Sequence, residues 1–170
     1  VGFVTGDLGP HPVATAARGA LQHLDALPGV VVACFALGGA DSWWRRNISA
    51  TLGDRFIALD APSPDAAADA FLARRLDVLV DLHGHTLGSG LPLLADPRLA
   101  RVLRLSFLGW PQTTGAPFLR HLVADGAAAA VERAAREFSE TLLLLGRGLS
   151  YLPADHAAVV GRARERPRAA

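Results

Sequence analysis

The chain has 170 residues, 51% of them hydrophobic and 19% charged, with a formal net charge of +1. Such a length and composition predict one globular domain with a sizeable core. They exclude a binding surface of the strongly basic kind that nucleic acid requires, and no apolar run is long enough to cross a bilayer. We therefore expect neither a nucleic-acid nor a membrane partner.

All seventeen basic residues are arginine. The single cysteine, Cys34, lies in an apolar run at 30–37, which predicts a small buried hydrophobic residue and no disulfide. The sequence starts at Val1 inside an apparent strand, without methionine or a visible signal peptide. These features predict a fragment of a longer protein, in which a targeting segment could have preceded Val1. We expect a cytoplasmic location.

Apolar runs rich in β-branched residues predict seven strands. In chain order they are 1–5, 30–37, 55–59, 77–82, 102–107, 119–124 and 141–145. Helical patterns are expected between most of them, at 12–27, 41–51, 63–76, 91–94 and 126–138. This alternation predicts an α/β fold, a Rossmann-like lobe with a mostly parallel sheet flanked by helices. We expect the lobe to span 1–155, followed by an Arg/Ala-rich tail or linker at 156–170.

Three short polar loops directly follow three of the predicted strands, at 6–12, 81–86 and 108–115. Because parallel strands end at the same edge of a sheet, these loops can converge on one crevice, where such folds bind ligands. Glycine permits close approach of the backbone, and histidine and threonine supply proton-transfer and hydrogen-bonding groups. The sequence therefore predicts one site built from the three loops.

In the first loop, His11 precedes Pro12, a residue suited to the first turn of a helix. His11 is therefore expected at or beside the N-cap, where the positive end of the helix dipole favours the neutral ring that a general base needs. We predict His11 as a candidate base, and the alternative is a residue that only caps or packs the turn.

In the second loop, Asp81, His83 and His85 occupy alternating positions after an apolar strand. Residues two apart in an extended segment point to one side, so a metal chelate is geometrically possible. Metal-dependent phosphoesterases of this pattern need further acidic and histidine ligands, which the downstream sequence does not offer. The alternative is that Asp81 accepts hydrogen bonds from amides of the turn and one histidine is buried.

In the third loop, Pro111 and Gly115 favour turns, and Thr113 and Thr114 could hydrogen-bond a hydroxyl-rich or phosphate group. Trp110 either lines a sugar or nucleotide site or belongs to the core. Most turns of this kind only connect elements, so both interpretations stay open.

Taken in serial order, these segments resemble the family 41 glycosyltransferases, the O-linked N-acetylglucosamine transferases. The resemblance covers about residues 1–155, and the matching segments are 1–12, 55–59, 77–86, 107–117 and 138–140. It implies the N-terminal catalytic lobe of a two-lobed GT-B enzyme. In the family pattern, helical tetratricopeptide repeats precede this lobe and a second Rossmann-like lobe follows it.

The resemblance implies transfer of N-acetylglucosamine from UDP-GlcNAc to Ser and Thr hydroxyls of protein acceptors, with inversion and without a metal or other cofactor. His11 falls on the histidine of the family's Gly-x-His-Pro motif, which has been proposed as the base near the acceptor. The family's phosphate-neutralising lysine belongs to the second lobe, so the isolated lobe is expected to be inactive. The expected residues of the cleft are Pro12, His85, Thr86, Gly109, Pro111, Thr113 and Thr114.

The chain departs from the family pattern at several positions. Thr15 replaces a second histidine, His83 replaces asparagine and Gln112 replaces glycine. The customary Arg-Pro-Ala-Pro-Val-Gln is replaced by Leu99-Ala100-Arg101-Val102-Leu103-Arg104. Two alternative functions therefore stay open: a non-catalytic protein-interaction lobe of a diverged homologue and, as the minor one, a metallohydrolase using Asp81, His83 and His85.

Overall fold

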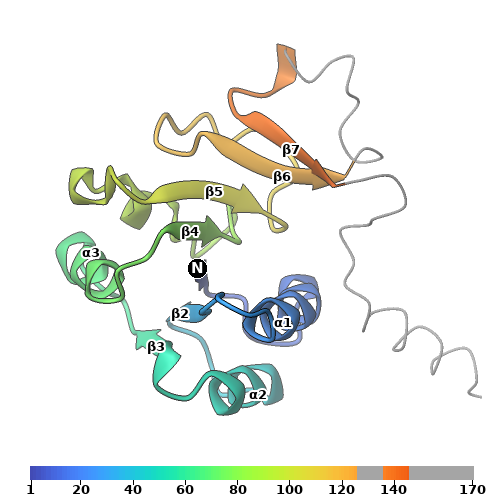
Figure 1. Ribbon diagram of the computed structural model, residues 1–170, viewed down its shortest axis with the longest axis vertical. Coiled ribbons are helices and arrows are strands. Elements are labelled where there is room, and N and C mark those ends of the chain that lie inside the picture. The colour runs from blue at the N-terminus through green and yellow to red at the C-terminus, as the bar shows by residue number, and fades with distance from the viewer. Residues whose placement is uncertain (126–135, 146–170) are drawn as a thin grey trace, which may run out of the picture.

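The computed structural model describes residues 1–125 and 136–145, which contain a seven-stranded sheet (Figure 1). The strands are β1 (Gly2–Thr5), β2 (Ala33–Leu37), β3 (Phe56–Leu59), β4 (Val78–Asp81), β5 (Leu103–Phe107), β6 (His121–Asp125) and β7 (Thr141–Leu145). They lie in the order β3-β2-β1-β4-β5-β6-β7, and every neighbouring pair is parallel. The seven predicted strands and the parallel α/β sheet are confirmed.

Helices α1 (Pro12–Asp25) and α2 (Trp43–Leu52) cover one face of the sheet, and α3 (Pro64–Ala73) covers the other (Figure 1). The side chain of the residue before each helix caps its first turn: His11 for α1, Ser42 for α2 and Ser63 for α3. Short 3₁₀ helices lie at Gly53–Arg55, Leu91–Ala95 and Pro97–Leu99. Most of the helical pattern at 126–138, and the tail at 156–170, lie outside the described residues.

The core has two layers because successive side chains of the strands point to opposite faces. Phe3 packs with α1 and α2, and its neighbour Val4 packs with Phe71 of α3. The centre of the sheet, at β1, β2 and β4, is thus covered on both faces, which is the pattern typical of a continuous apolar run such as 30–37. Cys34 is fully buried, and burial raises the pKa of its thiol to about 12, which makes it the inert hydrophobic residue expected from the sequence.

The strand order places the ends of β1, β4 and β5 next to one another. From β1 the chain builds outwards to β3, then crosses back to form β4 on the other side of β1. In open α/β sheets, ligands bind outside the carboxyl ends of the strands at such a switch point. The three polar loops of the sequence follow these three strands. No helix in the described part of the chain has the length and apolar character to cross a membrane.

Candidate functional site

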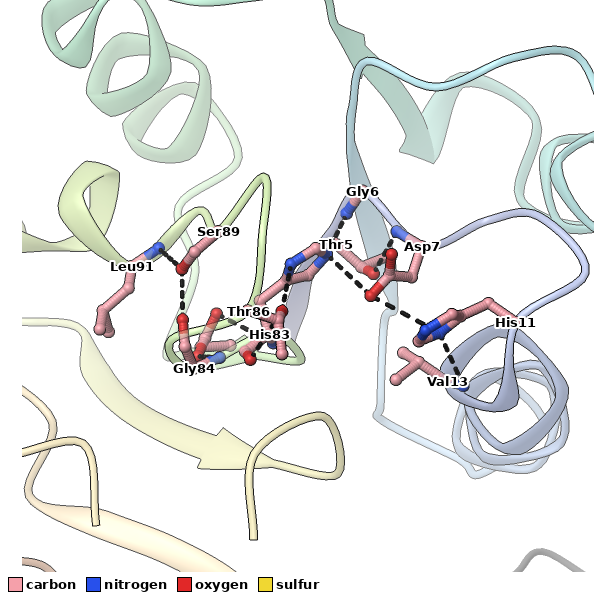
Figure 2. Close-up of polar contacts among 11 residues, drawn as sticks. Thr5, Gly6, Asp7, His11, Val13, His83, Gly84, Thr86, Ser89 and Leu91 are labelled. Atoms are coloured by element: carbon pink, nitrogen blue, oxygen red, sulfur yellow. Dashed lines mark hydrogen bonds and ion pairs between the residues drawn. The ribbon is translucent and has the colours of Figure 1, made fainter. Parts of the chain in front are cut away.

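His83 joins the loop after β4 to the loop after β1 (Figure 2). Its Nε2 accepts a hydrogen bond of 2.6 Å from the backbone N–H of Gly6. Because Nε2 accepts, the neutral ring carries its proton on Nδ1, which lies 3.1 Å from the Thr86 hydroxyl oxygen. The Thr86 hydroxyl in turn donates to the His83 carbonyl. Only 1% of the His83 side chain is exposed, so this ring is a fixed structural link between the loops.

The carboxylate of Asp7 lies between two imidazole rings (Figure 2). Its Oδ2 is 3.4 Å from His83 Nε2 and 3.6 Å from His11 Nδ1. Burial lowers the pKa of His83 and outweighs the opposite effect of Asp7, while His11 lowers it further. His83 is therefore neutral near pH 7, and Asp7 is available to stabilise a positive charge on His11. The sequence signal for Asp7 was its position four residues before His11 in the same loop.

His11 occupies the N-cap of α1, as the sequence predicted. Its Nδ1 accepts the Val13 N–H at 3.3 Å, and Pro12 is the first residue of the helix. In this geometry a neutral His11 ring carries its proton on Nε2. The side chain is 48% exposed, so capping the helix leaves the ring accessible to a ligand.

His85 joins the second loop to the third. Its Nε2 donates to the Thr114 carbonyl at 2.7 Å, and its ring packs edge-on against Trp110 with centroids 5.5 Å apart. The second loop thus contacts the first through His83 and the third through His85. The convergence of the three loops at one edge of the sheet is observed. The binding roles assigned to their individual residues stay predictions.

Two glycines allow the second and third loops to pack closely. A Cβ added at Gly109 would lie 2.0 Å from the Leu82 carbonyl oxygen, and one added at Gly84 would lie 2.1 Å from Trp110 Cβ. Gly84 also has φ +58°, a conformation that disfavours other residues. The Trp110 indole donates to the Thr113 carbonyl at 3.1 Å. Trp110 therefore packs between the loops, and Gly109 acts by its small size.

Glu140, just before β7, holds the third loop in place. Its carboxylate accepts the hydroxyls of Thr113 and Thr114 and the backbone N–H of Thr114, the last at 2.7 Å. Burial raises the pKa of Glu140, but the hydrogen bonds from both threonines outweigh it and leave the pKa below its usual value. The two hydroxyls expected to bind a hydroxyl-rich or phosphate group therefore already have a partner within the protein.

Glu140→Gln should destabilise the protein by about 2–3 kcal/mol near neutral pH, because it weakens charge-assisted hydrogen bonds to a buried group. Because the pKa of Glu140 is lower in the folded protein, its carboxylate stabilises the fold fully at pH values above the unfolded pKa of about 4.3. This stabilisation is lost as the pH falls through the pKa of the folded protein. Denaturant unfolding of wild type and variant at pH 7 and pH 4 measures the difference. Asp60→Ala, at an exposed carboxylate, is the control. A difference that does not shrink at low pH contradicts the assignment.

The proposed metal trio does not converge. Asp81 Oδ1 accepts the His83 N–H at 3.2 Å and its Oδ2 accepts the Gly84 N–H at 2.6 Å, while the two rings contact different loops. Burial raises the pKa of Asp81 to about 6, more than these hydrogen bonds and His85 lower it. No group of three or more metal-ligating residues occurs within 1–125 and 136–145. The three residues therefore form no chelate in this structure, and the alternative of a turn acceptor with one buried histidine is confirmed.

Comparison with known proteins identifies the family. A model described as glycosyl transferase family 41 matches residues 1–167. The chain belongs to glycosyltransferase family 41.

Curated relatives of this family 41 chain carry transferase names. It is 30% identical over 126 residues to the probable UDP-N-acetylglucosamine--peptide N-acetylglucosaminyltransferase SEC of Arabidopsis thaliana, covering 74% of this chain and 12% of that protein. It is 27% identical over 169 residues to the UDP-N-acetylglucosamine--peptide N-acetylglucosaminyltransferase of Caenorhabditis elegans, covering 94% and 14%. The chain thus spans a small part of these relatives.

A solved structure shares the fold of the family 41 chain. It is a mutant of the Thermobaculum terrenum O-GlcNAc transferase, with a TM-score of 0.72 at 23% identity over 89% of this chain and 28% of that one. This likeness confirms the predicted fold, a Rossmann-like lobe of the GT-B type.

Proposed function

We propose that the complete protein transfers N-acetylglucosamine from UDP-GlcNAc to Ser and Thr hydroxyls of proteins, with inversion and without a metal. The names of its relatives support the donor and the acceptor class. The observation that carries this chain's part is the accessible ring of His11 beside the Asp7 carboxylate, at the switch point of the sheet. This chain would form the acceptor-side wall of the cleft.

His11 would position the acceptor hydroxyl and accept its proton. With its proton on Nε2, the ring donates a hydrogen bond to an acceptor oxygen. To act as a base through Nε2, the ring must give up the Val13 N–H bond and carry its proton on Nδ1, which lies 3.6 Å from the Asp7 carboxylate. When the ring becomes an imidazolium, the Asp7 carboxylate offsets the new charge. Inversion requires attack opposite the leaving UDP, so a base on this lobe suits phosphate-stabilising groups on another.

The other cleft residues would contribute in two ways. His85 and Pro111 are exposed and would contact substrate directly. The remaining five act through the shape of the helix start and the loops. They are Pro12, Thr86, Gly109, Thr113 and Thr114.

Donor binding would need parts that the relatives carry beyond this segment. This chain has no lysine to neutralise the leaving diphosphate, and we propose that a second Rossmann-like lobe supplies it. Tetratricopeptide repeats would hold the protein acceptor. The cytoplasmic location of the protein stays a prediction.

The full-length protein should glycosylate a protein acceptor from UDP-GlcNAc in the presence of EDTA, whereas residues 1–170 alone should show no turnover. Mass spectrometry of the acceptor and release of UDP measure both. Transfer or hydrolysis by the isolated chain would contradict the two-lobe proposal. Activity of the full-length protein that EDTA abolishes would contradict the metal-free mechanism.

A further inference from the structure

A hollow of about 680 Å³ lies at the amino ends of β5 and β6, at the sheet edge opposite the candidate site. Its volume is in the range of small-molecule sites. Its wall includes the apolar residues Val102, Pro117 and Phe118 and the arginines Arg101, Arg104 and Arg120. No carboxylate of the described residues lines it.

Arg104 is held in a fixed position in this wall. Its Nη1 donates to the Leu94 carbonyl at 2.8 Å, and its guanidinium carbon lies 5.6 Å from the centroid of the Phe118 ring. Its Nε is buried and has no hydrogen-bond partner among the described residues. Burial, together with the nearby charge of Arg120, lowers the pKa of Arg104. The hollow therefore contains a positive charge that no carboxylate of the described chain compensates.

The other two arginines add to this charge. Arg101 and Arg120 are exposed, and neither forms a salt bridge with a residue of the described chain. Asp96, next to the wall, is paired with Arg98 at 2.8 Å and so does not neutralise them. An anion entering the hollow would meet three guanidinium groups.

We propose that this hollow binds a small molecule that carries a phosphate group beside a ring or apolar part. Planar guanidinium groups match phosphate oxygens, and charge-assisted hydrogen bonds to arginine are among the strongest. The wall of Val102, Pro117 and Phe118 would hold the apolar part. The site lies at the other edge of the sheet, so it can fill while the cleft is occupied.

The hollow coincides with a departure from the family pattern. Five of its lining residues come from the segment that replaces Arg-Pro-Ala-Pro-Val-Gln, and Arg101 and Arg104 stand where that pattern has alanine and glutamine. The segment thus carries two arginines where the pattern has one. Replacing Arg101 with alanine and Arg104 with glutamine removes both charges of this segment from the wall.

The test is isothermal titration calorimetry, which measures the affinity of the full-length protein for phenyl phosphate. Saturating UDP is present to occupy a donor site. Phenyl phosphate should bind, inorganic phosphate should bind more weakly, and phenol should not bind. Three variants should each lower the affinity for phenyl phosphate by about tenfold or more. They are the single variants Arg101→Ala and Arg120→Gln, both at exposed positions, and the double variant Arg101→Ala/Arg104→Gln. Arg46→Gln, on the exposed surface of α2, should leave binding unchanged.

Absence of binding by phenyl phosphate would overturn the proposal. So would affinity that is undiminished in both Arg101→Ala and Arg120→Gln, whatever the stability of the Arg104 variant. Binding reduced equally by Arg46→Gln would reveal a non-specific effect of charge and also overturn it. Since the titration measures binding alone, a protein without transferase activity can still support or refute this site.

Discussion

Replacing His11 with asparagine in the full-length protein should lower the rate of transfer to a protein acceptor by about two to four powers of ten. Asparagine can still accept the Val13 N–H at the N-cap, so the start of α1 is preserved while the imidazole is removed. Steady-state measurement of kcat and KM at saturating UDP-GlcNAc gives the size of the loss. We expect the loss in kcat.

Two further variants define the role of His11. His23→Ala, at the far end of α1, removes an exposed imidazole that hydrogen-bonds the Gly19 carbonyl, and activity should not change. Asp7→Asn should cost about tenfold, because Asp7 acts on the reaction only through its neighbour. Full activity of the His11 variant would exclude both roles proposed for this ring. It would favour the alternative of a lobe that only binds protein.

Replacing Gly109 with alanine should destabilise the lobe by about 3 kcal/mol or more, because the new methyl group would overlap a backbone carbonyl. The carbonyl oxygen belongs to Leu82, 2.0 Å from where the new Cβ would lie, and cannot rotate away as a flexible side chain can. Thermal or denaturant unfolding measures the change, which corresponds to about 6–12 °C in Tm for a domain of this size.

Gly9→Ala is the matched control for Gly109→Ala. Gly9 lies in the first loop, and a Cβ added there would meet no atom within 4 Å. Its substitution should change stability by less than about 0.5 kcal/mol. Equal midpoints for the two variants would show that the second and third loops can separate at little cost.

The centre of the sheet was predictable because both faces of β1, β2 and β4 are buried, which leaves unbroken apolar runs in the sequence. The ends of the helices were less predictable from the sequence. Helix α1 ends at Asp25 and not, as the sequence had predicted, at residue 27. The carboxylate of this last residue, Asp25, binds Arg55. Helix α3 ends at Ala73, and Arg75 beyond it has φ +49°. A contact between residues 30 apart in sequence leaves no signal in the local pattern.

The site was predictable as a set of loops and not as a set of contacts. Strand ends alone require the loops to meet, but the Gly6–His83 and Thr114–Glu140 hydrogen bonds join residues 77 and 26 apart. The predicted chelate of Asp81, His83 and His85 was wrong because it extended the alternation of a strand into a turn. At Gly84 the backbone adopts φ +58°, and His83 and His85 then contact different loops.

The ring of His83 has a consequence for which substitutions this lobe can accept. A Cβ at Gly6 would lie 3.4 Å from His83 Cε1, 3.5 Å from its Nε2 and 3.0 Å from the Leu37 carbonyl oxygen. The two His83 distances are ordinary van der Waals contacts, so the Leu37 carbonyl is the atom that limits a side chain at position 6. Because Nε2 of His83 accepts the Gly6 N–H, replacing His83 would remove the partner of a backbone donor 77 residues away in the sequence.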